Sequence, residues 1–253
     1  MFDNFLTWDL SGEVLSSLIV MVIVALLFII AGIMARFHDP LKPSKGLLFV
    51  AETLIGFFDG LVGELMGSKF KGMGGFITAV ASYLFIAFIF GLTGLPSPVT
   101  YMAVPLSMGF LTFGMIHITS MRFTKFRYFK RYIEPNPVFL PINLISMWAP
   151  VLSLSLRLFG NALAGFVIMS LIYAGFDQLS AACINLVSSW TEAGSWNFVA
   201  PIPAAILHCY FDLFSGFIQT TVFIFLSMIL ISQEAPEDEL EETESLKRGG
   251  SNI

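Results

Sequence analysis

Charged residues are scarce in this chain of 253 residues, because Asp, Glu, Lys and Arg together make up only 12% of it. Soluble domains usually carry about 25% charged residues. Hydrophobic residues account for 56% of the chain, and 27 residues are Phe. This composition excludes a soluble, disordered, collagen-like or coiled-coil protein and indicates a membrane protein. A sustained strand-like alternation is also missing, which argues against a transmembrane β-barrel and leaves an all-α fold.

Motifs for catalysis and for metal binding are missing as well. The two cysteines, Cys183 and Cys209, have no CxxC or other metal-ligand spacing. The chain has no Gly-x-x-x-x-Gly-Lys-Ser/Thr phosphate loop, no HExxH motif and no nucleophile elbow. We therefore expect no cofactor, no metal and no catalytic residue. The basic residues form no nucleic-acid footprint, so the expected surroundings are membrane lipid and partner proteins.

The positions of the basic residues predict the topology, because positive charge stays on the cytoplasmic side of a membrane. Twelve of the 13 basic residues lie in two loops and the tail. Placing these segments in the cytoplasm leaves the N-terminus outside, and residues 1–13 contain acidic but no basic side chains. The twelve are Arg36, Lys42, Lys45, Lys69, Lys71, Arg122, Lys125, Arg127, Lys130, Arg131, Lys247 and Arg248.

The uncharged runs predict about five membrane helices, because roughly 20 apolar residues cross a hydrocarbon core of about 30 Å. A turn at Gly94–Pro98 separates the second span from the third. The whole chain, 1–253, forms a single membrane domain with an acidic cytoplasmic tail at 233–253. The predicted spans are residues 14–35, 76–94, 100–121, 137–176 and 201–232.

Residues 43–71 carry Glu52, Asp59 and Glu64 among hydrophobic residues. Three acidic side chains at the centre of a bilayer would be costly. We therefore predict an amphipathic helix at the cytoplasmic interface, with a sixth span as the alternative.

The last two spans are too long to cross the membrane upright. Helices of roughly 40 and 32 residues would be about 60 and 48 Å long if they were continuous. We therefore predict a long, strongly tilted hairpin, and a tilt of this size needs a partner. The alternative is that Pro141, Pro150 and Pro203 cut off short entry segments and leave two ordinary spans.

Arg157 is the one basic residue inside an apolar run, and no acidic residue lies within ten positions of it. A charged arginine in mid-membrane costs about 2.5 to 3.5 kcal/mol on insertion scales. Its guanidinium keeps its proton, so it can attract a carboxylate but cannot relay a proton. These properties favour a functional role over a snorkelling or structurally paired arginine.

Four polar residues of the last span recur at helical spacing: His208, Asp212, Ser215 and Gln219. Asp212 is the one acidic residue there before the tail, so this face is typical of a proton-access channel. The alternatives are a structural ion pair between Asp212 and Arg157, and interfacial packing of His208. His117 lies five residues before a basic loop and fits an interfacial position better than a functional one.

The run Leu152-Ser-Leu-Ser-Leu-Arg-Leu-Phe-Gly-Asn-Ala-Leu-Ala-Gly165 closely resembles the signature of subunit a of bacterial F-type ATP synthases. Further similarity lies in Pro141–Leu144, Gly94–Pro98 and Phe211–Gln219. The resemblance implies an ion-translocating stator subunit of the bacterial plasma membrane. Such a subunit provides two half-channels that pass protons to and from the carboxylates of a c-subunit ring. The resemblance also implies the b subunits of the peripheral stalk, and the remainder of the ATP synthase, as partners.

The resemblance assigns roles to particular residues. Arg157 matches the arginine that separates the half-channels and draws in the ring carboxylate. Asn161 and Gln219 match polar partners of the arginine and the ring. Asp212 matches the acidic or histidine position of the outer half-channel, with Ser215 and His208 as weaker lining candidates.

Two departures from the family pattern concern the half-channels. Phe166 stands where many relatives have Glu, His or another polar residue, and no acidic residue lies between Ile145 and Pro150. Asp212 then has fewer titratable partners. The weaker half-channel candidates are therefore Glu192, Asp177 and His117.

Two other classes of protein remain as alternatives. A secondary transporter with Arg157 as an anionic-substrate site would be expected to show inverted repeats, and no internal repeat is visible. An intramembrane enzyme would need a recognisable catalytic motif, which is missing. Proton rather than sodium coupling is the default expectation.

Overall fold

The computed structural model describes residues 12–38, 44–70, 72–124, 140–187 and 201–234, and every regular element in these ranges is helical. The elements are α1 (Gly12–Phe37), α2 (Leu47–Leu65), η2 (Ser68–Phe70), α3 (Gly74–Ile89), η3 (Phe90–Thr93), η4 (Pro98–Thr100), α4 (Ala103–Thr124), α6 (Leu140–Val187), α7 (Pro201–His208), η6 (Cys209–Ser215) and α8 (Gly216–Ser232).

Five segments within these ranges are long and apolar enough to cross a membrane. The expected all-α membrane protein is therefore confirmed. The segments are Val14–Phe37, Gly74–Thr93, Ala103–Phe123, Ile145–Ser180 and Pro203–Ser232.

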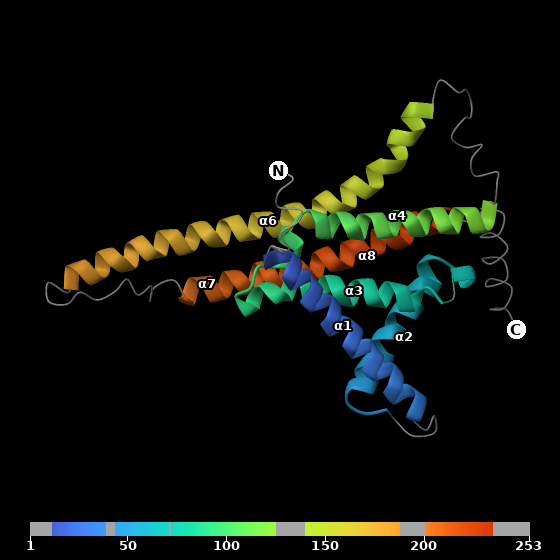
Figure 1. Cartoon of the computed structure of the whole chain (residues 1–253), viewed down its shortest axis with the longest axis horizontal. Helices are drawn as coiled ribbons and strands as arrows, with labels where there is room; N and C mark the ends of the chain where they lie inside the picture. The colour runs from blue at the N-terminus through green and yellow to red at the C-terminus, as the bar shows by residue number, and fades with distance from the viewer. Residues whose placement is uncertain (1–11, 39–43, 71, 125–139, 188–200, 235–253) are drawn as a thin grey trace, which may run out of the picture.

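The long helices pack in an elongated bundle. α6 packs on α4 and α8, and α3 packs on α1, α2 and α8. In Figure 1, α3, α4 and α8 run along the long axis of the molecule, whereas α1 crosses α3 obliquely. The C-terminal half of α6 extends together with α7 beyond the other helices.

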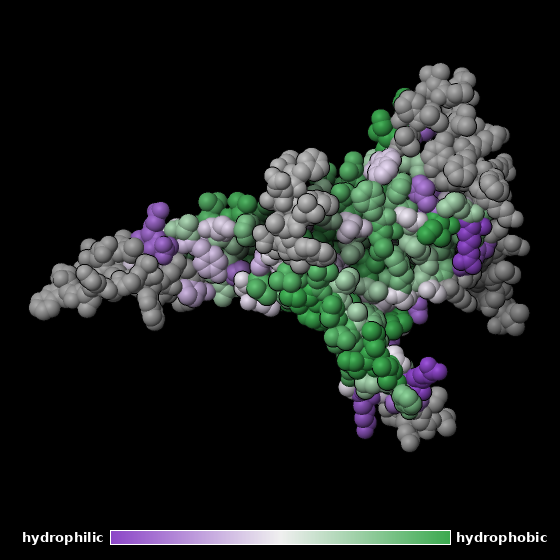
Figure 2. Space-filling model, viewed as in Figure 1, coloured by the Kyte–Doolittle hydropathy of each residue, from purple (hydrophilic) through white to green (hydrophobic). Residues whose placement is uncertain are grey.

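The core forms where α1, α3, α6 and α8 meet, and Val20, Leu84, Leu158 and Phe223 are at most 1% exposed there. Gly216 allows close packing, because a Cβ at this position would lie 2.6 Å from Phe88 Cβ. Figure 2 shows hydrophobic surface over the middle of the molecule and hydrophilic residues at its extremities, as a bilayer requires.

α6 is longer than expected. It has 48 residues and contains Pro150, so this proline does not cut off an entry segment. A proline inside a helix removes one backbone donor and bends the helix, and Figure 1 shows the first part of α6 bending away from the rest. The helix continues past the predicted end of the span at residue 176 and runs to Val187, and no Gly or Pro interrupts residues 177–187.

The second span ends through short 3-10 turns. η3 follows α3 directly, and Gly94 then adopts φ 80°, a left-handed conformation that suits glycine. Ser97 donates a hydrogen bond of 3.0 Å to the carbonyl of Ala87 and holds the turn against α3.

The segment predicted to lie at the interface contains α2, which is not among the five span candidates in the described ranges. Glu52, Asp59 and Glu64 are all exposed on it. The N-terminal segment, most of the second basic loop, Glu192 and most of the acidic tail lie outside the described residues.

Candidate functional site

Arg157 lies on the outward face of α6. Its neighbours Val151, Leu154 and Leu158 are 2%, 3% and 1% exposed and form the packed face of the helix, whereas Arg157 itself is exposed. Arg157 makes no hydrogen bond or ion pair with any residue that the structure describes. The guanidinium is therefore presented to the outside of the chain, in the middle of the helix.

Small residues surround Arg157 on this face. Ser153, Gly160 and Ala164 lie four residues before, three after and seven after it, and all three are exposed. A Cβ at Gly160 would meet no atom within 4 Å. Because none of these side chains stands far out from the helix, another helix can approach Arg157 closely.

Three further predicted residues lie near the packed edge of this face or on the helix opposite. Asn161 donates a hydrogen bond of 2.7 Å from Nδ2 to the hydroxyl of Ser215, joining α6 to η6. One turn further along, Gln219 Oε1 is buried and has no hydrogen-bond partner among the described residues. A buried acceptor without a partner is costly, so Gln219 can accept a hydrogen bond from a donor that is brought close to it.

Asp212 lies in a π-helical segment, η6, which the sequence pattern did not predict. His208 Nδ1 lies 2.6 Å from Asp212 Oδ2, and these side chains are 28% and 22% exposed. Asp212 lies against η3, because a Cβ at Gly91 would be 3.3 Å from its Oδ1. Short π-helical segments are frequent at functional sites.

The four polar residues of the last span contact different neighbours. Asp212 pairs with His208 and lies against η3, whereas Ser215 bonds to Asn161 of α6. The ion pair between Asp212 and Arg157, considered from the sequence, is not formed, since Arg157 has no partner in the described ranges.

Tyr173 joins this group, and the sequence pattern missed it. Its hydroxyl lies 3.1 Å from His208 Nε2, so the imidazole connects a tyrosine of α6 to Asp212. A single tyrosine near the end of an apolar helix is usually an interfacial anchor. The contact with His208 depends on how α6 and α7 pair, which no local spacing reveals.

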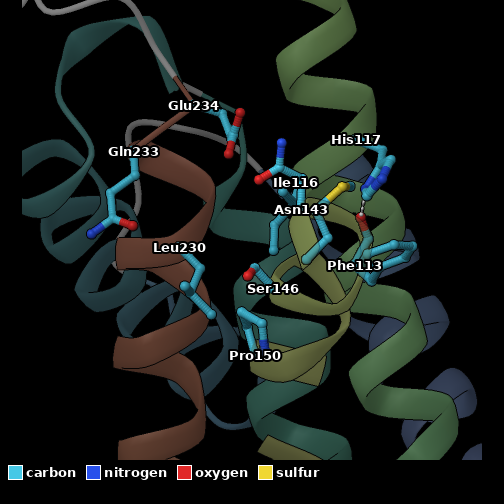
Figure 3. A pocket seen from close by; sticks show the side chains of 10 residues that line it. Phe113, Ile116, His117, Asn143, Ser146, Pro150, Leu230, Gln233 and Glu234 are labelled. Atoms are coloured by element: carbon cyan, nitrogen blue, oxygen red, sulfur yellow. Dashed lines mark hydrogen bonds between the residues drawn. The ribbon is translucent and has the colours of Figure 1, made fainter. Parts of the chain in front are cut away.

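A cavity of about 280 Å³ lies at the opposite end of α8, between α4, the start of α6 and the last turn of α8 (Figure 3). Its polar lining comes from His117, Asn143, Ser146, Gln233 and Glu234, and Phe113, Ile116, Met147, Pro150 and Leu230 complete its wall. His117 Nδ1 lies 2.9 Å from the carbonyl of Phe113. With roughly 30 Å³ of liquid volume per water molecule, the cavity has room for several waters.

The two remaining candidates are Asp177 and Glu192. Asp177 is exposed on α6, four residues beyond Tyr173, and Glu192 lies outside the described residues.

Comparison with known proteins agrees with the sequence motifs. The model of a family described as ATP synthase A chain matches residues 14–232, which is most of the chain. Among similar proteins, ATP synthase subunit a of Mycoplasmoides gallisepticum is 28% identical over 249 residues, covering 92% of this chain and 82% of the relative. ATP synthase subunit a of Staphylococcus carnosus is 28% identical over 250 residues, covering 92% and 96%.

A relative from Propionigenium modestum is described as sodium ion specific ATP synthase subunit a, and it is 32% identical over 197 residues, covering 71% of this chain and 60% of the relative. The family expected from the arginine-containing motif is thus confirmed. The chain belongs to the ATP synthase A chain family, whose members are non-catalytic, multi-pass membrane subunits that translocate protons or sodium ions in bacterial F-type ATP synthases.

Proposed function

We propose that this chain conducts protons through two half-channels that are separated by Arg157, and that the outward face of α6 lies against a ring of c subunits. The proposal rests above all on Arg157, an exposed guanidinium without a partner in the described ranges and the one basic residue of α6. Such a charge in a membrane needs an anionic partner. Within the described ranges the chain supplies none, so the partner is a carboxylate of the ring.

The neighbours of Arg157 support this contact. Ser153, Gly160 and Ala164 leave room for a second helix. On α8, the buried oxygen of Gln219 has no partner among the described residues, so it can accept a hydrogen bond from a donor that is brought close to it. As each ring carboxylate arrives, Arg157 favours its ionised form and so promotes release of its proton. The fixed positive charge also prevents a proton from passing straight between the two half-channels.

The outer half-channel uses Asp212 and His208, a titratable pair joined by a contact of 2.6 Å. Both side chains are partly exposed. In the proposed orientation, the N-terminus is outside and the C-terminus is cytoplasmic. The C-terminal end of α6 and the start of α7 then lie toward the outside, so the pair lies on the external side of Arg157.

The inner half-channel uses the cavity beside the last turn of α8. Ser146 lines this cavity eleven residues before Arg157, a spacing of about three helical turns that places both on one face of α6. Waters in the cavity connect the cytoplasm to that face. His117 and Glu234 give it titratable groups.

The length of α6 supports a strong tilt along the ring. Its 48 residues would extend about 72 Å, more than twice the roughly 30 Å of a hydrocarbon core. In this arrangement the b subunits of the peripheral stalk hold the chain still while the ring turns, and α2 lies at the cytoplasmic surface.

Replacing Arg157 with Ala tests the proposal. We expect ATP-driven proton pumping in membrane vesicles to be lost, while the complex still assembles with its c subunits. Arg122→Ala is the matched control, since Arg122 is an exposed arginine at the end of α4 and does not line the cavity. Normal coupled pumping by the Arg157→Ala complex would overturn the proposal. Measuring pumping with and without sodium ions distinguishes proton from sodium coupling.

A further inference from the structure

The pair of Asp212 and His208 continues to a third residue on another helix. We propose that Tyr173 and His208 form the outermost steps of the outer half-channel, a hydrogen-bonded relay that delivers protons to Asp212. The inference rests on the proposed function and adds to it the residue through which protons enter.

The geometry is a continuous chain of three side chains. Tyr173 Oη lies 3.1 Å from His208 Nε2, and His208 Nδ1 lies 2.6 Å from Asp212 Oδ2. Both nitrogens of the imidazole are thus used, one toward each neighbour. Tyr173 is an exposed residue, whereas the side chains of His208 and Asp212 are only partly exposed, so the relay leads from the surface inward.

A proton can pass along this chain without moving any backbone. Tyr173 gives its hydroxyl proton to Nε2 of His208 and takes a proton from water on the same oxygen. The imidazole gives its Nδ1 proton to the Asp212 carboxylate. One proton has then left water and one carboxyl has been protonated. After Asp212 passes its proton on, the imidazole returns to its first tautomer by exchange with water.

α6 offers no nearer group for this step. Between Ala162 and Ile172 its one polar side chain is Ser170, whose hydroxyl donates 2.8 Å to the carbonyl of Phe166 in its own helix. Phe166 is 57% exposed and cannot carry a proton. Tyr173 is therefore the residue of α6 through which the histidine meets water.

Tyr173→Phe removes the hydroxyl and keeps the ring. In vesicles that hold the membrane sector without the soluble catalytic part, we expect passive proton flux to fall about tenfold. That loss is smaller than the 10²-fold or more typical of a positioned acid–base group, because water can partly replace the hydroxyl. Tyr210→Phe is the control, since Tyr210 is exposed in η6 and its hydroxyl has no hydrogen-bond partner among the described residues.

His208→Gln provides the second test, because glutamine can hydrogen-bond but cannot take up a proton. Proton flux in the His208→Gln variant should fall at least as far as in Tyr173→Phe. Combining the two changes should lower the flux no further, since both break the same relay. A merely structural tyrosine would lower the flux again in the double variant, and that result would overturn the inference.

The relay and the proposed function fail in different ways. If Tyr173→Phe and His208→Gln both conduct normally while Arg157→Ala abolishes coupled pumping, the relay is wrong and the function stands. If Arg157→Ala also pumps normally, the function itself is wrong. Co-purification of the c subunits with each variant establishes that the complex has assembled.

Discussion

In the proposed function, the two ends of the α6–α8 pair offer protons different kinds of path. At one end, Tyr173, His208 and Asp212 form a chain of direct contacts of 3.1 and 2.6 Å. At the other end, a cavity of about 280 Å³ is lined by His117, Asn143, Ser146 and other residues. Proton transfer along a chain of side chains requires every member of the chain, whereas proton transfer through water in a cavity requires space for the water. Replacing a single polar side chain should therefore lower proton flux through the first end. Adding a bulky side chain should lower proton flux through the second end.

Arg157 lies along α6 between these ends and belongs to neither. It is exposed on the face where Gly160 and Ala164 leave room for another helix, and it has no partner in the described ranges. In the proposed function, protons from either end therefore transfer to a carrier outside this chain.

The largest effect is expected from Asp212→Asn, which keeps the size of the side chain and removes its charge. Asp212 is the innermost member of the chain of contacts. Passive proton flux through the membrane sector should fall by about 10²-fold or more, the usual contribution of a positioned proton-transfer group. Unchanged flux in an assembled complex would show that Asp212 does not carry protons. The proposed difference between the two ends would then be wrong.

A smaller effect is expected from Ser146→Phe, which places a bulky ring in the cavity. Because waters and not one hydroxyl carry the proton there, we expect a several-fold loss of flux in Ser146→Phe and almost none in Ser146→Ala. Ser107→Phe is the matched control, since Ser107 is exposed on α4 and its hydroxyl also bonds within its own helix. Equal losses for Ser146→Ala and Ser146→Phe would show that the inner end also uses a side-chain relay.

The smallest effect is expected from Asn161→Ala, which breaks the 2.7 Å hydrogen bond that joins α6 to η6. A neutral hydrogen bond of this kind contributes about 1 kcal/mol net, so the temperature of inactivation should fall by a few degrees and coupling should persist. Ser215→Ala should add little to Asn161→Ala, because the two changes remove one bond. If the losses of stability from Asn161→Ala and Ser215→Ala were additive, the hydrogen bond between these residues would be contradicted. Ser170→Ala, which removes a bond within α6 alone, is the control.

The sequence predicted most of the fold because the apolar composition of a segment identifies it as a membrane span. Long apolar runs and the loop charges give five helices without any tertiary information, and Arg157 is conspicuous as a charge in such a run. The continuity of α6 was harder to predict, because Pro150 considered alone favours a break in the helix. In the structure α6 packs on α4 and α8 and is continuous through Pro150.

The site was predicted less completely than the fold. Regular α-helical spacing placed His208, Asp212, Ser215 and Gln219 on one face, but the π-helical turn at Cys209–Ser215 directs Asp212 to η3 and Ser215 to α6. Tyr173 was missed because its contact with His208 joins residues 35 positions apart. The inner cavity was also missed, since it forms where α4, the start of α6 and the last turn of α8 meet.

In the proposed function the outward face of α6 around Arg157 meets the c ring, and disulfide cross-linking can detect this contact. The variant is Ala164→Cys in a chain whose Cys183 and Cys209 are replaced by Ser, paired with a cysteine beside the carboxylate of the c subunit. Leu158→Cys, on the buried face of α6, is the control. We expect rapid cross-linking of Ala164→Cys and none of Leu158→Cys. Absence of any cross-link from Ala164→Cys, in a complex that pumps normally, would contradict it.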